Sequence, residues 1–117
     1  APLYAGASAK SLLAFLTDEQ IVTYLQNVEL TAITQHTMTN LSELKKQLEE
    51  IRALGYATSK SERVLGANSV SVPILAGPRQ PIASVTIVIP EVRYAQYDEQ
   101  QLIALVKQAA HQIQRQF

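Results

Sequence analysis

Residues 69–75 (SVSVPIL) and 83–89 (ASVTIVI) decide the fold, because both stretches alternate between two kinds of side chain. A period of two is typical of β-strands, in which successive side chains point to opposite faces of a sheet. One face is apolar in both stretches and carries Val70, Val72, Ile74, Val85, Ile87 and Ile89. Between them lies AGPRQP (76–81), which has the glycine and prolines of a turn. The pattern predicts an antiparallel hairpin whose apolar face packs against helices.

The other face of this hairpin is small and polar, since it carries Ser69, Ser71, Ser84 and Thr86. A buried hydroxyl without a hydrogen-bond partner costs about 1–3 kcal/mol. These side chains are therefore expected to face water, to bond backbone groups, or to line a cavity that a ligand fills. The alternation alone leaves all of these possibilities open.

Helices are predicted on both sides of the hairpin. Thr17, Asn40 and Asp98 are each followed three positions later by Gln or Glu, which is the pattern of a capping box at a helix start. A shorter helix is predicted over residues 8–16. The expected apolar stripes are Ile21, Val22 and Leu25 in the first capped helix, Leu41, Leu44, Leu48 and Ile51 in the second, and Leu102, Val106, Ala109 and Ile113 in the third.

The order of these elements predicts the fold class. Gly55 predicts the end of the second capped helix, and GYATS (55–59) predicts a third, shorter strand. Helices come first, adjacent strands follow, and a helix ends the chain. This order favours an α+β fold with an antiparallel sheet over a parallel βαβ repeat.

Composition excludes several classes of function. The 117 residues fit one domain, and ten basic side chains balance ten acidic ones, so no strong field would attract DNA or an anionic membrane. The chain has no cysteine, which excludes disulfides and fits a cytoplasmic protein. No apolar run is long enough to span a bilayer, so no membrane partner is expected. No cofactor, metal or catalytic motif occurs, so the chain is not expected to be an enzyme.

Several motifs together resemble the effector-binding domain of IclR-type transcriptional regulators. They are LYAGASAKSLLAFLTDEQI (3–21), the stretch from LSELKKQLEEIRALGYA through the loop Glu62–Gly66 to SVPI (41–74), and QPIASVTIVIP (80–90). Each piece is weak alone, but their order and spacing match the family along essentially all of the chain.

The resemblance implies a GAF-like fold, with a curved antiparallel sheet and helices packed on it. It also implies that residues 1–117 form an effector-binding domain without its first strands and without the N-terminal winged helix-turn-helix of the family. The expected partners are a small organic effector, DNA through a domain outside this chain, and further copies of the protein in a homodimer or homotetramer.

The resemblance also implies the site. Backbone amides of Ala7 and Ser8, at the start of the first helix, would hold the carboxylate of the effector, and helix N-termini favour anions. Hydroxyls of Ser59, Ser69 and Thr86 would donate to it, and Val88 would complete the wall. Ser59 stands where the family often carries an acid, so the effector of one relative cannot be transferred to this chain. Lys10 is expected to reach water or to pair with a loop carboxylate.

Two other kinds of function remain open from the residues. The chain could be a GAF- or PAS-like sensor of another pathway, or a dimerisation module that binds no ligand and has a solvated hydroxyl face. A small enzyme is disfavoured because catalytic groups are missing.

Overall fold

The computed structural model describes residues 6–30, 32, 34–35, 37, 39–61 and 65–116. Its elements are α1 (Ala7–Leu13), α2 (Asp18–Asn27), α3 (Leu41–Leu54), β1 (Ala57–Lys60), β2 (Ala67–Gly77), β3 (Gln80–Pro90), α4 (Glu91–Tyr94) and α5 (Glu99–Gln114). Helices flank an antiparallel sheet, so the predicted α+β class is confirmed.

The sheet is the predicted hairpin with one short strand added. Its order is β1-β2-β3, and both pairs are antiparallel. Gly77 pairs with Gln80, so the hairpin turns at Pro78 and Arg79, inside the predicted turn. GYATS contributes β1, which pairs with the first half of β2. In the described residues both β1 and β3 are edge strands; that further strands precede this chain stays a prediction.

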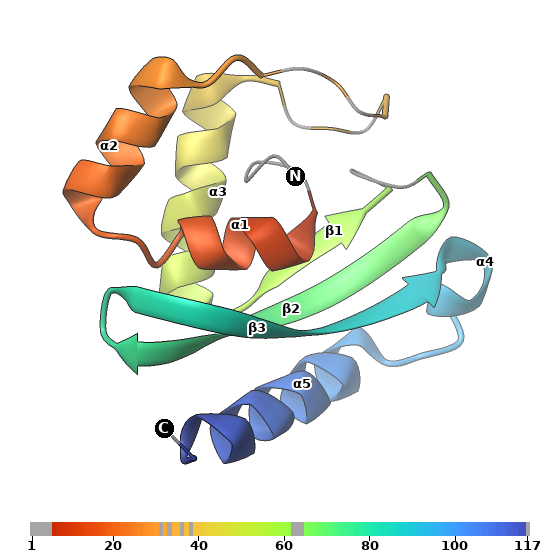
Figure 1. The fold of residues 1–117 in the computed structure, drawn as a ribbon. Helices are drawn as coiled ribbons and strands as arrows, with labels where there is room; N and C mark the ends of the chain where they lie inside the picture. Colours follow the sequence, from red (N-terminus) through yellow and green to blue (C-terminus); the bar gives the residue numbers. More distant parts are fainter. Residues whose placement is uncertain are drawn as a thin grey trace.

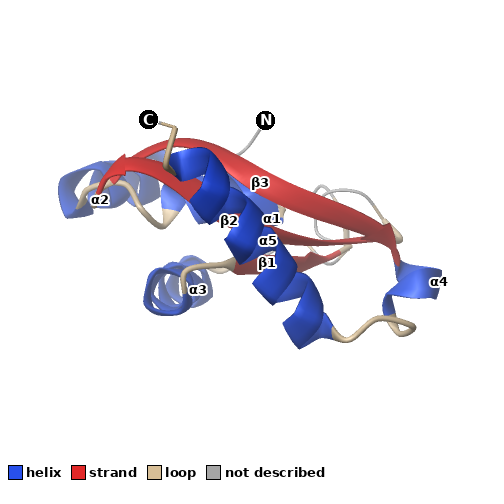
Figure 2. Cartoon of the chain, turned by 90° about the horizontal axis from the view of Figure 1, so that it is seen from below, coloured by secondary structure: helices blue, strands red, loops and turns tan. Residues whose placement is uncertain are grey.

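The two faces of the sheet are covered by different helices. α5 packs on the apolar face, where Val70, Val72 and Ile74 form a cluster with Ile103 and Val106 of the helix. Figure 2, seen from below, shows α5 crossing in front of the strands. α1, α2 and α3 lie on the opposite side (Figure 1). The second cluster there joins these three helices to the sheet through Ala57. The prediction that a helix covers the apolar face is confirmed.

The helix ends follow the predicted capping residues. Thr17 forms a full capping box, in which its side chain accepts from Gln20 N and the Gln20 side chain accepts from Thr17 N. Asn40 accepts from the Glu43 amide, and Gly55 ends α3 with φ 82°, a left-handed conformation that favours glycine.

The third cap differs from the prediction. Asp98 accepts from the amide of Gln100 rather than from that of Gln101. The short Asp side chain reaches the nearer of the two free amides. The helix still begins where predicted, because either amide satisfies one open donor.

All three predicted stripes are partly wrong. In α3 the predicted Leu41 is 45% exposed, whereas Leu44, Leu48 and Ile51 are buried. In α5 the buried residues are Leu102, Ile103, Val106 and Ala110, whereas Ile113 is 41% exposed. The helix has apolar residues on several flanks, and its crossing over β2 selects which of them are buried. In α2 only Ile21 is buried, and Val22 is 52% exposed.

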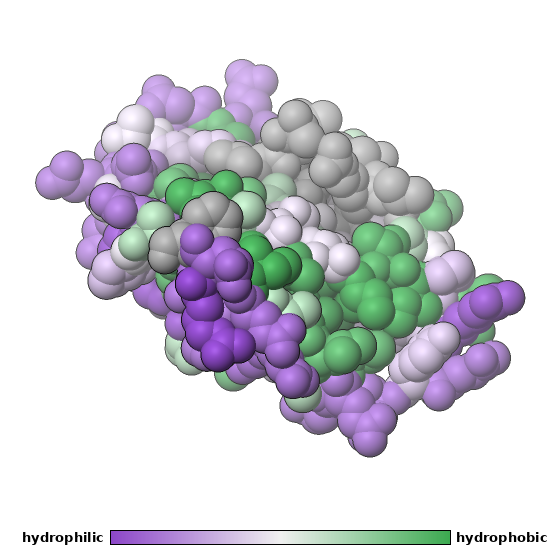
Figure 3. All heavy atoms as spheres, turned by 60° about the horizontal axis from the view of Figure 1, so that its bottom comes forward, coloured by the Kyte–Doolittle hydropathy of each residue, from purple (hydrophilic) through white to green (hydrophobic). Residues whose placement is uncertain are grey.

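Exposed apolar residues lie on several elements. Figure 3, with the bottom of the molecule brought forward, shows apolar side chains gathered beside paler, small ones. The largest exposed fractions on β3, α4 and α5 are those of Val88 at 62%, Val92 at 86% and Leu105 at 57%. None of the helices formed by described residues is long and apolar enough to cross a membrane.

A cluster of charges fixes the C-terminal end of α1. The Arg79 guanidinium in the hairpin turn donates to the carbonyl of Leu16 and, at 2.9 Å, to Asp18. Arg52 of α3 donates to Ala14 O at 3.0 Å and to Asp18 at 3.3 Å. The hydrogen bond and the charge of Arg79 lower the pKa of the Asp18 carboxyl. The turn, α1 and α3 are thereby joined at one point.

Replacing Arg79 with alanine is expected to lower the melting temperature by a few degrees near pH 6. A carboxyl with a depressed pKa adds stability above its unfolded pKa, and this stability is lost as the pH falls through the lower folded pKa. Part of the difference in melting temperature between the wild type and Arg79→Ala should therefore vanish below about pH 3.8, the ordinary pKa of Asp18. Melting curves at pH 6 and pH 2.5 measure it.

Arg93→Ala is the matched control, because Arg93 is an exposed arginine for which no ion pair occurs in the described part of the chain. It should leave the melting temperature nearly unchanged at both pH values. If Arg79→Ala lowered the melting temperature by the same amount at pH 6 and at pH 2.5, the ion pair with Asp18 would not be the source of the stabilisation.

Candidate functional site

α1 lies directly on the hydroxyl face of the hairpin. Ser8 Oγ is 2.8 Å from Ser84 Oγ of β3, and Ser11 Oγ is 3.2 Å from Ser71 Oγ of β2. Serine and alanine side chains let the helix approach the strands closely enough for hydroxyls to bond directly. The hydroxyl face is therefore neither fully solvated nor an empty cavity: α1 covers part of it, and hydroxyls satisfy one another.

These contacts continue as a network. Thr86 Oγ1 donates to Ser71 Oγ at 2.9 Å, and Ser11 Oγ donates to the backbone oxygen of Ser8 at 2.8 Å. Sequence reasoning named Ser71 and Ser84 on the polar face but missed Ser11. The signal was the spacing of three between Ser8 and Ser11, which places both on one side of a helix.

The first turn of α1 has no side-chain cap. Gly6 is the N-cap residue, with φ 89° and no side chain to accept a hydrogen bond. The first intrahelical bond runs from Lys10 N to Gly6 O at 3.2 Å. The amides of Ala7, Ser8 and Ala9 consequently have no acceptor in the described part of the chain, as expected for a first turn without a cap. Ala7 is 1% exposed, whereas Ser8 and Ala9 are partly exposed.

The predicted sheet residues lie in a row on this same face. Ser59 pairs with Ser69, and Ser69 pairs with Val88, so one line crosses all three strands. Thr86 is two positions from Val88 on β3 and therefore shares its face. Ser59 is 4% exposed and Val88 is 62% exposed, so the row runs from a buried side to an open one.

All six predicted residues thus lie on the α1 side of the sheet, two in the first turn of the helix and four on the strands. No hydrogen bond joins the hydroxyls of Ser59 or Ser69 to another described residue. Glu62, in the loop of the family resemblance, lies outside the described residues.

Lys10 is buried rather than extended toward water. Its side chain is 2% exposed, and Nζ is 3.2 Å from Gln47 Oε1 of α3. The alternative that Lys10 reaches water is wrong, because the helix places its side chain between α1 and α3. The other alternative, a pair with a loop carboxylate, stays a prediction, since Glu62 lies outside the described residues.

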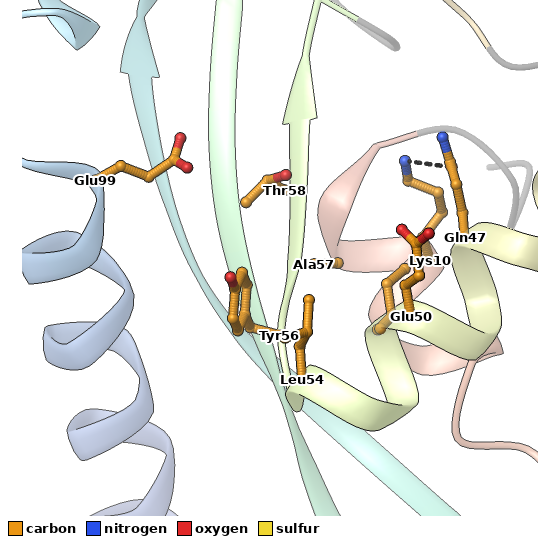
Figure 4. A pocket seen from close by; sticks show the side chains of 9 residues that line it. Lys10, Gln47, Glu50, Leu54, Tyr56, Ala57, Thr58 and Glu99 are labelled. Carbon is orange, nitrogen blue, oxygen red and sulfur yellow. Dashed lines mark hydrogen bonds between the residues drawn. The ribbon is translucent and has the colours of Figure 1, made fainter.

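A separate hollow of about 200 Å³ follows the open edge of β1. Figure 4 shows Lys10, Gln47 and Glu50 on one side of the strand and Thr58 and Glu99 on the other. The other lining residues are Ile51, Leu54, Tyr56 and Ala57. None of the six predicted residues lines it, nor do they line two further hollows beside α2. The candidate site is therefore distinct from these hollows.

Clusters of metal-ligating side chains are absent from the described ranges. No group of three or more His, Cys, Asp or Glu side chains that could hold a metal occurs among them. The candidate site instead combines backbone amides with neutral hydroxyls, a donor set suited to a small polar organic anion.

Comparison with known proteins identifies the family. The model of the bacterial transcriptional regulator IclR C-terminal domain matches residues 1–115. The chain belongs to the IclR family. The HTH-type transcriptional regulator KipR of Bacillus subtilis is 36% identical over 114 residues, which are 97% of this chain and 46% of that protein. The IclR C-terminal domain described here thus spans less than half the length of that relative.

Solved structures agree with this assignment. The Thermotoga maritima IclR structure has a TM-score of 0.87 at 36% identity, covering 97% of this IclR chain and 46% of that one. The inducer-binding domain of an Acinetobacter PobR double mutant, in complex with 3-hydroxybenzoic acid, has a TM-score of 0.87 at 25% identity. The match covers 97% of this chain and 66% of that one. Such relatives are transcriptional regulators, which confirms the expectation that the chain is not an enzyme.

Proposed function

We propose that this IclR domain binds a small organic carboxylate between the first turn of α1 and the hydroxyl face of the sheet. The observation that carries the proposal is the set of amides at Ala7, Ser8 and Ala9, which have no described acceptor and lie beside that face. Amides at a helix start attract an anion through their N–H groups. The PobR domain, which was solved with an acid, supports the choice of ligand class.

The strands supply the rest of the site. Ser59 and Ser69 offer hydroxyls without described partners, and Thr86 and Val88 extend the floor toward the open side of β3. Neutral side chains surround the anion, so the charge of the acid would be balanced by oriented dipoles. An uncharged analogue would lose most of this stabilisation.

In the full-length protein the acid would act as an effector. Binding would favour one arrangement of subunits in a homodimer or homotetramer and so change DNA binding by a winged helix-turn-helix domain. Relatives named as HTH-type regulators support this step. The physical argument from the described residues covers the binding site alone.

The test is a thermal-shift screen of the full-length protein against small carboxylates and their matching amides, such as benzoate and benzamide. At least one acid should raise the melting temperature, and its amide should not. Ser69→Leu should reduce the affinity for that acid at least about tenfold, because the larger side chain fills the floor of the site. This estimate corresponds to about 1.4 kcal/mol of lost binding free energy.

Ser42→Leu is the matched control, because Ser42 is an exposed serine in the first turn of α3 and lies away from the site. It should leave the thermal shift unchanged. The proposal fails if no acid raises the melting temperature, or if Ser69→Leu binds the acid as tightly as the wild type.

A further inference from the structure

The hydroxyl network between α1 and the sheet has a fixed direction. It runs from Thr86 Oγ1 to Ser71 Oγ at 2.9 Å, from there to Ser11 Oγ at 3.2 Å, and ends at the backbone oxygen of Ser8 at 2.8 Å. A carbonyl oxygen has no proton, so at this end it can only accept. Ser11 must therefore donate to it.

The donor in each of the other hydrogen bonds follows from the carbonyl of Ser8, which can only accept. Each hydroxyl carries one proton, and the proton of Ser11 is already donated to the carbonyl oxygen of Ser8. The contact between Ser11 and Ser71 then requires Ser71 to donate. Thr86 in turn donates to Ser71, because the proton of Ser71 is already used. Thr86 consequently offers a ligand lone pairs but no proton, which differs from the expectation that its hydroxyl donates to the effector.

The other end of the site has the opposite character. Ser8 and Ser84 share one hydrogen bond at 2.8 Å, which uses one of their two protons and leaves the other without an acceptor among the described residues. The amides of Ala7 and Ser8, which have no acceptor among the described residues, lie in the same first turn of α1. Ser84 and Thr86 are two positions apart on β3, so about 7 Å separates the donor end from the acceptor end.

We propose that the effector is an acid with a second group that donates a hydrogen bond, such as a hydroxyl, and that this group binds Thr86. The inference rests on the proposed function and makes it more specific. Ser71 and Ser11 are positioning residues, because they hold the proton of Thr86 away from the ligand. An oxo acid, whose carbonyl can only accept, would face the lone pairs of Thr86 and bind more weakly.

The test compares matched acids that differ in this group alone. The probes are 4-hydroxypentanoate with 4-oxopentanoate, and 3-(1-hydroxyethyl)benzoate with 3-acetylbenzoate, titrated calorimetrically into the full-length protein. In each pair that binds, the hydroxy acid should bind the wild type about tenfold more tightly, since the oxo acid leaves a polar group unpaired.

Ser71→Ala should reduce the ratio between the affinities for the hydroxy acid and the oxo acid to about threefold or less, because the oxo acid binds this variant more tightly. Without Ser71 the hydroxyl of Thr86 can rotate and donate to the ligand. Ser11→Ala should act in the same direction, because Ser71 can then donate to Thr86 and so release the proton of Thr86. This second variant keeps the test informative if Ser71→Ala does not fold. Ser42→Ala, on the exposed surface of α3, should leave the ratio at its wild-type value.

The outcomes separate the two proposals. Equal binding of hydroxy and oxo acids by the wild type would overturn the inference while leaving acid binding intact. So would a ratio that stays near tenfold in both Ser71→Ala and Ser11→Ala. If neither member of any pair binds, and no acid in the thermal-shift screen raises the melting temperature, the proposed function fails and the inference fails with it.

Discussion

Changing Ala7 to proline is expected to weaken acid binding by about 10- to 100-fold while the domain stays folded. Ala7 is the first residue of α1, where proline is tolerated because the missing N–H has no intrahelical acceptor. The substitution removes one amide donor and places a ring carbon where the carboxylate would lie. A hydrogen bond to a charged group contributes about 1.5–3 kcal/mol, which corresponds to this range.

Ala7→Gly is the control, since it keeps the amide and removes only a methyl group. Calorimetric titration with the tightest acid of the screen measures both variants, and circular dichroism checks their fold. Wild-type affinity in a folded Ala7→Pro variant would mean that the first turn of α1 does not hold the acid.

Changing Leu48 to alanine should lower the free energy of unfolding by about 2–5 kcal/mol, the range for leucines in well-packed cores. Leu48 is 2% exposed and belongs to the cluster that holds α1, α2 and α3 together. Its truncation leaves a cavity beneath the helix that carries the proposed site. Urea titration of the two proteins measures the difference.

Leu54→Ala on the same helix is the matched control, because Leu54 is 52% exposed. It should cost well under about 1 kcal/mol, as surface changes usually do. If Leu48→Ala cost no more than Leu54→Ala, the helical layer would not depend on this cluster.

Local sequence patterns predicted the parts of the fold that depend on local physics. The period of two in SVSVPIL and ASVTIVI assigned β2 and β3 and separated their faces correctly. Gly55 and the capping residues predicted helix ends, because these ends are satisfied by neighbours in the chain. The resemblance to the IclR family implied six site residues, and all six lie on the α1 side of the sheet; that they bind an effector stays a prediction.

Features set by tertiary contacts were not predictable in the same way. The bonds of Ser8 to Ser84 and of Ser11 to Ser71 join residues 76 and 60 positions apart. No periodicity specifies that α1 crosses the sheet at these serines. The same holds for the choice between Ala109 and Ala110 on the buried face of α5, since both are apolar and only the crossing of the helix over β2 distinguishes them.

The α4 turn was also missed. Its four residues are too few to show a helical period, and Tyr94 at its end donates to Glu99 of α5 at 2.7 Å. Burial, together with the Glu99 carboxylate, raises the pKa of the Tyr94 phenol. This contact is again between side chains of different elements.

The most direct test of the central claim is to follow backbone amide signals by ¹H–¹⁵N correlation spectra while the tightest acid of the screen is added. We expect the largest shifts at Ala7, Ser8 and Ala9, with further shifts at Ser69 and Thr86, and no comparable shift along the outer face of α3 at Ser42. Large shifts confined to the residues of the hollow beside β1, such as Tyr56 and Thr58, with Ala7 and Ser8 unchanged, would contradict the account.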